Sequence, residues 1–272
     1  MGNGVYCQAT LNYFDGAVGR PVTLDVLDGR AAAGDLELET CGFRLVEHSS
    51  AVTDWHDHAQ VDRVHRPEAE ALVTEITGCE VAISYPPIHR SREEAQKTPD
   101  YAPIELVHSD FTDDYGPMIT DPERRYRAFL DPLLESHGLT HDDVASASRL
   151  MVLQFWRNTG PTRPDYPMAF CAADGVGPDR MVREMLPEYG GLRVDSQFYA
   201  VRPPGDADPD RWYTFPDLTT SEAVALRTYD SRCIDEGRPF WTPHSAFRDP
   251  HVRSADKQYR KSVETRVLCI WR

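Results

Sequence analysis

Alternating apolar and polar positions predict strands at both ends of the chain. Near the amino terminus, two strands are expected over Val5–Phe14 and Arg20–Leu27, joined across a turn-forming Asp-Gly pair. Cys41–Val52 is β-like, and Glu80–Tyr85 alternates as a further strand. The second half is richer in the same pattern, with strands predicted over Leu150–Arg157, Pro167–Ala172, Ser196–Val201, Trp212–Phe215, Ala223–Tyr229 and Ser262–Trp271.

Helical periodicity is concentrated in the first half. It predicts a helix over Pro67–Thr77, with proline in the first turn and Gly78 after the last. A second helix is expected over Pro122–His137, and a short third one from Thr140. Helices concentrated in the first half, with strands dominating the second, are typical of an α+β protein. We expect a mainly β protein built on a β-sandwich or jelly roll. No linker-like stretch interrupts the pattern, which predicts one domain over residues 1–272.

Charge narrows the classes of partner. The 272 residues include 29 Lys and Arg against 44 Asp and Glu, which gives a net charge of −15. Nucleic acids and anionic membrane surfaces attract basic proteins, so neither is an expected partner. No apolar run of about 18 residues suggests a membrane span, and the first residues do not resemble a secretory signal. These features predict a soluble, cytoplasmic protein.

A candidate metal site begins at His108-Ser109-Asp110, which follows the apolar run Ile104–Val107. Residues i and i+2 of a strand project from the same face, so the imidazole and the carboxylate can reach one ion. His244 lies far downstream in another β-rich region. Two histidines and one carboxylate are the facial ligand set of non-haem Fe(II) oxygenases.

Two arginines near the carboxyl terminus are candidates for binding a carboxylate. Arg260 precedes Ser262 by two residues, so a guanidinium and a hydroxyl can share one face of the last strand. Arg266 lies on the same face if that strand is regular, and it is the rival for the same role. Order and spacing favour Arg260 but leave the choice open.

The order of these motifs resembles one family. They are Val107–Phe111, Phe155–Pro161, Trp212-Tyr213, Tyr229–Ser231, Pro243–Pro250 and Arg260–Arg266. Together they are similar to the natural-product oxygenases grouped with the cephamycin hydroxylase component and the gibberellin-desaturase-like hydroxylases. One departure is Gln154, where the family is expected to carry asparagine.

The resemblance implies a double-stranded β-helix (a cupin-like jelly roll) with flanking helices that binds Fe(II) and 2-oxoglutarate. His108, Asp110 and His244 would bind the iron. Arg260 and Ser262 would bind the cosubstrate, with Arg266 as the rival to Arg260. The implied reaction uses O2 to oxidise a C–H bond of a small molecule of secondary metabolism, by hydroxylation, desaturation or ring closure, and releases succinate and CO2. A homodimer is also implied.

Four further residues are tentative contacts of the substrate: Arg157, Gln154, His89 and Tyr101. Two alternative functions remain open at this point. The same ligands could serve a metal-dependent hydrolase or isomerase, or the chain could be a non-catalytic partner subunit.

Overall fold

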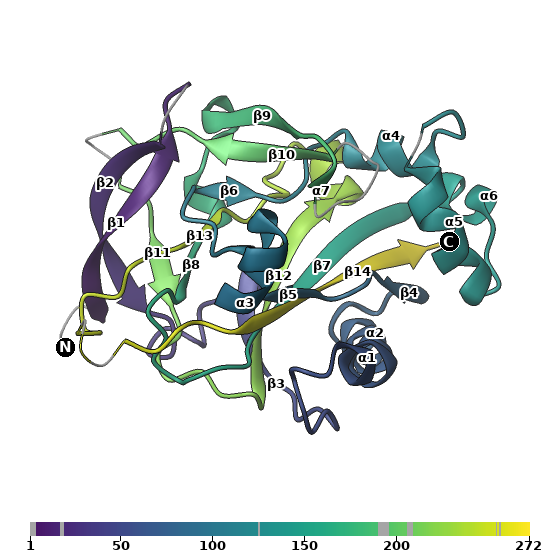
Figure 1. The fold of residues 1–272 in the computed structure, drawn as a ribbon. Coiled ribbons are helices and arrows are strands. Elements are labelled where there is room, and N and C mark those ends of the chain that lie inside the picture. Colours follow the sequence, from purple (N-terminus) through teal and green to yellow (C-terminus); the bar gives the residue numbers. More distant parts are fainter. Residues whose placement is uncertain are drawn as a thin grey trace.

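Two β-sheets form the centre of the molecule (Figure 1). The computed structural model describes residues 4–16, 19–124, 126–189, 196–205, 209–253, 255 and 257–272. The first sheet is eight-stranded and runs in the order β1 (Val5–Phe14), β2 (Gly19–Asp28), β11 (Trp212–Thr214), β8 (Met168–Cys171), β13 (His244–Ala246), β6 (His108–Ser109), β10 (Ser196–Val201) and β9 (Met181–Leu186).

The second sheet contains the longest strands of the carboxyl-terminal half. Its order is β3 (Phe43–Glu47), β12 (Glu222–Asp230), β7 (Arg149–Asn158), β14 (Ser262–Trp271) and β4 (Val81–Ser84), and β5 (Ile88–Arg90) also pairs with β14. Neighbours within this sheet are antiparallel.

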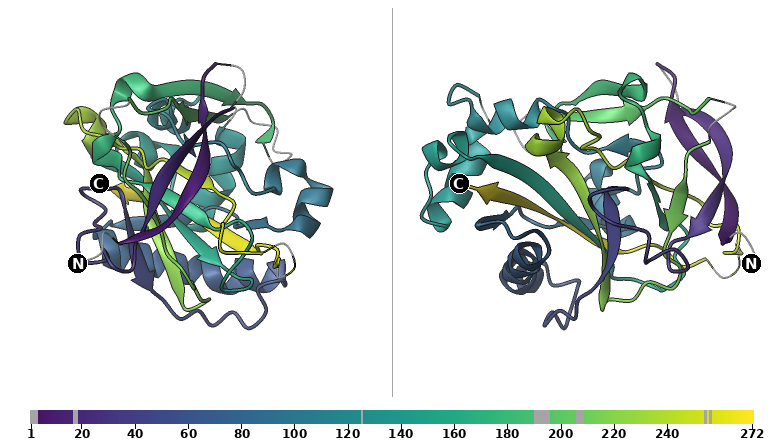
Figure 2. Two further views of the ribbon diagram at one scale, coloured as in Figure 1. Left: turned by 90° about the vertical axis from the view of Figure 1, so that its left-hand side faces the viewer. Right: turned by 180° about the vertical axis from the view of Figure 1, so that it is seen from behind.

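Helices cover the outside of the strands. They are α1 (His58–Gln60), α2 (Arg66–Thr77), α3 (Arg92–Lys97), α4 (Tyr115–Thr120), α5 (Arg127–Ser136), α6 (His141–Ala145) and α7 (Ser231–Asp235). The hairpin β1–β2 lies at the end of the molecule away from α4, α5 and α6, as both Figure 1 and the rear view in Figure 2 show. No helix of the described ranges combines the length and apolarity that a membrane span needs.

Strand periodicity separates two apolar layers. Phe155 of β7 packs with Val73 of α2 on the outer face of the second sheet, in one buried cluster. The next residue, Trp156, projects from the opposite face and packs with Phe170 of the first sheet. Each of these side chains is removed from water, which contributes roughly 1.5–3 kcal/mol for a large apolar residue. The inner layer between the sheets is therefore the frame that positions the polar site.

Most predicted elements are confirmed, and one helix begins later than expected. The strands at Val5–Phe14, Ser196–Val201 and Ser262–Trp271 have the predicted bounds. The helix predicted from Pro122 begins at Arg127, because the segment after Asp121 closes a turn in which Arg124 N–H donates to the Asp121 carbonyl. The prediction was therefore wrong over residues 122–124 and 126, and residue 125 lies outside the described ranges.

Candidate functional site

Two neighbouring strands bring the predicted metal ligands together. His244 of β13 is the antiparallel partner of His108 of β6, and Asp110 follows β6 directly. Nε2 of His108 lies 3.7 Å from one Asp110 oxygen, and Nε2 of His244 lies 3.7 Å from the other. The candidate ligand atoms of the three residues all lie within 4.8 Å of one another.

Backbone carbonyls orient both imidazoles for a cation. Nδ1 of His108 donates to the Leu106 carbonyl at 2.7 Å, and Nδ1 of His244 donates to the Thr242 carbonyl at 2.9 Å. A carbonyl can only accept, so both Nδ1 atoms carry the proton and both Nε2 atoms present a lone pair. This is the usual outer arrangement around histidines that bind a metal.

The charge states of His108 and Asp110 suit the same purpose. Burial, followed by the neighbouring His244, lowers the pKa of His108 to about 4, so its ring is neutral near pH 7. Burial alone would raise the pKa of Asp110, but Arg266, His244 and His108 outweigh it and lower this pKa far below its usual range. One buried Asp110 oxygen, Oδ2, has no hydrogen-bond donor. Converging acceptors without a donor fit a metal cation.

Arg260 lies beside this group and has no carboxylate partner within the described residues. Its guanidinium is buried and donates to the Tyr166 carbonyl at 3.3 Å and toward the Met168 sulfur at 3.1 Å, while Nε has no acceptor. Burial, with Arg90 nearby, lowers the pKa of Arg260 to about 9. An incoming carboxylate would therefore replace a weak thioether acceptor with a charged one.

A narrow cavity joins Arg260 to the two histidines, and we name it the arginine cavity. As the side chains stand its volume is about 10 Å³, so a bound organic acid would need them to move apart. It is lined by Arg90, Ile104, His108, Gln154, Trp156, Met168, Phe170, Leu226, His244, Arg260 and Glu264.

Arg266 is engaged by carboxylates, in contrast to Arg260. Its Nη2 lies 2.6 Å from Glu264 and 3.3 Å from Asp110, and its Nε donates to Gln154 at 3.2 Å. Glu264 also lies 3.4 Å from Nε of Arg90. Sequence reasoning missed Glu264 and Arg90. The shared face of residues 260, 262, 264 and 266 could have indicated Glu264, because every second residue of β14 points into the same layer.

The other predicted residues are dispersed. Ser262 and His89 line a separate hollow of about 290 Å³, together with His56 and His58. His58 stacks on His89, with ring centroids 3.7 Å apart. Among the described residues, this hollow does not gather a set of metal ligands.

Arg157 lies outside the cavities described above, in a buried polar group of its own. It donates to the backbone carbonyls of His48, Thr220 and Glu222. Its Nη2 also lies 2.8 Å from Nδ1 of His48.

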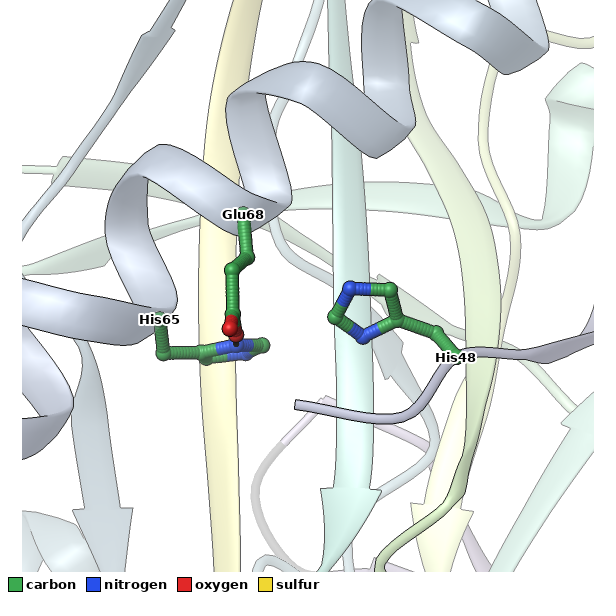
Figure 3. A group of neighbouring side chains, drawn as sticks. All are labelled: His48, His65 and Glu68. Atoms are coloured by element: carbon green, nitrogen blue, oxygen red, sulfur yellow. Dashed lines mark ion pairs between the residues drawn. The ribbon is translucent and has the colours of Figure 1, made fainter. Parts of the chain in front are cut away.

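That polar group includes a second set of two histidines and a carboxylate, His48, His65 and Glu68 (Figure 3). Because guanidinium can only donate, Arg157 uses the lone pair of His48 Nδ1 and places the proton on Nε2. At His108 and His244 the proton is on Nδ1 instead, so His48 has the opposite tautomer. The buried guanidinium of Arg157 would also repel a metal ion bound beside His48. We conclude that Arg157, which occupies the Nδ1 lone pair of His48, makes this second set unsuited to a metal ion.

Comparison with known proteins places the chain in a family. Residues 12–270 match the family described as "YDMC: Oxidoreductase/YMDC permease-like domain", and the chain belongs to it. It is 25% identical over 269 residues to "Hydroxylase/desaturase CTB9" of Cercospora beticola, covering 92% of this chain and 76% of that protein. It is 25% identical over 248 residues to "Alpha-ketoglutarate-dependent dioxygenase phiK" of Fungal sp. (strain ATCC 74256), covering 89% of this chain and 82% of that protein.

Solved structures agree on the fold. The "iron and alpha-ketoglutarate-dependent endoperoxidase NvfI" superimposes with a TM-score of 0.74 at 20% identity, covering 98% of both chains. A variant of the same protein gives a TM-score of 0.76 at 18% identity, covering 99% of both. The predicted jelly roll is thereby confirmed.

These matches confirm the enzyme class predicted from the motifs, an oxygenase that depends on iron and 2-oxoglutarate and acts on a small molecule with O2. None of the proteins named above is described as a hydrolase, an isomerase or a non-catalytic subunit.

Proposed function

We propose that His108, Asp110 and His244 bind the iron and that Arg260 binds the C5 carboxylate of 2-oxoglutarate. The observation that carries the proposal is the convergence of three acceptors, including the donor-less Asp110 Oδ2, beside a buried arginine that has no carboxylate. When bound, iron with 2-oxoglutarate and O2 supplies the oxidant for a substrate C–H bond, with release of succinate and CO2. This step would occur in a metabolic pathway for natural products, the setting implied by the motif resemblance.

Charge balance supports Arg260 over Arg266 as the cosubstrate ligand. Three largely buried arginines, Arg90, Arg260 and Arg266, face two largely buried carboxylates, Asp110 and Glu264. These carboxylates contact Arg90 and Arg266, and Asp165, whose charge also acts on Arg260, lies 3.5 Å from Lys257. The unbalanced positive charge therefore remains on Arg260. A buried cation without a partner is costly, and an anionic ligand removes that cost.

The chain's own residues have distinct tasks in this proposal. The Leu106 and Thr242 carbonyls fix the ring orientations of His108 and His244. Arg266 orients the Asp110 carboxylate through an ion pair. Gln154 lines the arginine cavity and accepts a hydrogen bond from Arg266. In this proposal it orients Arg266 and does not contact the substrate. Ser262 lines the neighbouring hollow instead of the arginine cavity, so the proposal gives it no contact with 2-oxoglutarate.

Several broader assignments belong to the same proposal. We expect residues 1–272 to act as one oxygenase domain, in the cytoplasm, with a small-molecule substrate and without nucleic-acid or membrane partners. A homodimer is expected from the family resemblance alone.

An anaerobic titration with Fe(II) and then 2-oxoglutarate tests the assignment. Chelated 2-oxoglutarate should give a visible metal-to-ligand charge-transfer band in the wild type. The band should be absent in His108→Ala, weakened in Arg260→Ala and retained in His141→Ala, a control on helix α6. Fe(II) binding without any band in the wild type would contradict the oxygenase assignment.

A further inference from the structure

Arg90 is a buried arginine that joins two segments far apart in the sequence. It is the last residue of β5, pairs with Ser262 of β14 and is 4% exposed. Its Nη1 donates to the Asp100 carbonyl at 2.7 Å and to the Ala102 carbonyl at 3.3 Å, and its Nη2 donates to the Tyr189 hydroxyl at 2.6 Å. One guanidinium therefore holds these two carbonyls and this hydroxyl in one place.

The three residues that accept from Arg90 line a cavity that two of the proposed iron ligands also border. This cavity, which we name the larger cavity, has a volume of about 320 Å³, and His108 and Asp110 are among its lining residues. A pocket of a few hundred Å³ has the usual size for a small organic ligand. Arg90 itself lines the arginine cavity, where 2-oxoglutarate is proposed to bind. Arg90 thus connects the lining of the cosubstrate site to a wall of the larger cavity.

Arg90 is charged, and this strengthens its hold on the wall. Its Nε lies 3.4 Å from a carboxylate oxygen of Glu264, a residue that it shares with Arg266. Burial alone would lower the pKa of Arg90, but Glu264 and Tyr189 outweigh burial and raise this pKa, so the guanidinium stays protonated. Hydrogen bonds from a charged donor are stronger than those between neutral groups.

The part of the wall that Arg90 holds is a short 3₁₀ turn, η2 (Pro99–Tyr101). The hydrogen bonds of such a turn have poorer geometry than those of an α-helix, so contacts from outside matter more. The N–H groups of Tyr101 and Ala102 close the turn, whereas the carbonyls of Asp100 and Ala102 accept from Arg90. Tyr101, a predicted contact of the substrate, lines an adjoining cavity of about 150 Å³.

We propose that Arg90 is a positioning residue for the substrate, because it holds the wall at Asp100, Ala102 and Tyr189 in a defined place relative to the metal ligands. The proposal rests on the proposed function, which puts iron and 2-oxoglutarate beside the larger cavity. A substrate in this cavity packs against the wall, and its C–H bond has to be presented to the iron in one direction. Arg90 acts through the wall and does not contact the substrate.

Amide hydrogen exchange tests the hold of Arg90 on the wall. Exchange is measured by mass spectrometry on anaerobic enzyme with Fe(II) and 2-oxoglutarate. In Arg90→Met, residues 99–102 should exchange at least tenfold faster than in the wild type, because the turn loses its donor. Arg92→Met is the matched control, because Arg92 is an exposed arginine whose guanidinium lies over the ring of Tyr259. Unchanged exchange over residues 99–102 in Arg90→Met would overturn the proposal.

A lysine variant separates the hold on the wall from the charge beside Glu264. Arg90→Lys keeps a positive charge but lacks the planar fork that reaches both carbonyls and the Tyr189 hydroxyl. The affinity for 2-oxoglutarate, read from the charge-transfer band, should therefore stay within about threefold of the wild type, whereas residues 99–102 should exchange about as fast as in Arg90→Met. Slow exchange in Arg90→Lys would show that charge alone holds the wall and would overturn the positioning role.

Binding of a probe connects the wall to the ligand side of the site. Indole is used, because the larger cavity includes apolar and aromatic side chains such as Leu106 and Phe198. Measured by anaerobic calorimetry on enzyme saturated with Fe(II) and 2-oxoglutarate, indole should bind to the wild type and to Arg92→Met alike, and at least fivefold more weakly to Arg90→Lys. Equal binding to the wild type and Arg90→Lys, or no binding to the wild type, would overturn the proposal.

The charge-transfer band of 2-oxoglutarate is recorded on the same samples, which separates the two levels of the argument. Absence of the band in the wild type would count against the iron and cosubstrate assignment. A normal band in the wild type and in Arg90→Lys, with no difference in indole binding between them, would count against the role of Arg90 alone.

Discussion

The imidazoles of His108 and His244 face each other across neighbouring antiparallel strands, with ring centroids 4.4 Å apart. Both rings donate Nδ1–H to a backbone carbonyl two residues earlier in the chain. Register and hydrogen bonding together fix the directions of the two Nε2 lone pairs, so the proposed metal site would be formed before an ion binds. The site is therefore organised by the backbone, and substitutions that move the backbone should affect iron binding as much as loss of a ligand does.

Iron stoichiometry should distinguish the two groups of histidines. We expect one Fe(II) per chain in the wild type and none in His108→Ala, measured by anaerobic titration and elemental analysis. His48→Ala should keep one equivalent, because Arg157 donates into the His48 ring and a cation there would be repelled. Two equivalents in the wild type and one in His48→Ala would show that the second group binds metal after all.

Arg260 and Arg266 should differ in what their removal changes. Arg260→Met should raise the dissociation constant of 2-oxoglutarate about tenfold to a hundredfold at saturating Fe(II), because charge-assisted hydrogen bonds contribute about 1.5–3 kcal/mol. Arg266→Met removes a guanidinium that does not line the arginine cavity, so 2-oxoglutarate affinity should fall less than in Arg260→Met. The charge-transfer band reports both affinities. A larger loss in Arg266→Met than in Arg260→Met would assign the cosubstrate to Arg266.

Long alternating runs allowed the sequence to predict most strands with close bounds. The strands that carry the two proposed histidine ligands are different: β6 has two residues and β13 has three, too few for a periodic signal. His108, Asp110 and His244 were predicted as ligands from the chemistry of their side chains and from motif order. Their convergence depends on the β13–β6 register, which no local pattern encodes.

The choice between Arg260 and Arg266 also needed the fold. Arg266 lies on β14 and Arg260 lies two residues before that strand begins, and sequence spacing could not separate them. Their surroundings come from distant segments: Asp110 and Gln154 reach Arg266, whereas Tyr166 and Met168 reach Arg260. Likewise, Arg157 was an open candidate for substrate binding, because its burial against His48 is set by tertiary packing.

Gly42 should be sensitive because it lies against the residue that orients His244. Its φ is +88°, and a Cβ there would lie 2.4 Å from Thr242 Oγ1. The same hydroxyl lies 2.6 Å from the Arg227 carbonyl and 3.0 Å from the Gly42 carbonyl, and the Thr242 carbonyl accepts from His244. Gly42→Ala should therefore lower the free energy of unfolding by at least about 1–2 kcal/mol in urea titration.

The same substitution should also weaken Fe(II) binding, because displacement of Thr242 moves His244. Gly34→Ala is the matched control, since no atom lies within 4 Å of a Cβ at that position. If Gly42→Ala lost stability but kept the Fe(II) affinity of the wild type, the coupling between Gly42 and the metal site would be refuted.

Acid should destabilise the protein partly through His65. This side chain is 1% exposed, and both of its ring nitrogens lack a hydrogen-bond partner. Burial, followed by Arg157, lowers the pKa of His65 to about 4, against 6.5 for the free side chain. The unfolded chain therefore takes up a proton as the pH falls below about 6.5, and the folded protein does not until about pH 4. The resulting loss of stability, on the order of 2–3 kcal/mol, should develop between these two values.

Urea midpoints of the wild type and His65→Leu, measured from pH 7.5 to 4.5, test this assignment. Leucine cannot titrate, so the variant should lose less stability than the wild type as the pH falls, even if it begins at a lower value. His137→Leu is the control, because His137 is a more accessible histidine beside Glu70. Parallel pH profiles for the wild type and His65→Leu would assign the acid sensitivity to other buried groups, among them His48, whose pKa is also lowered by burial and by Arg157.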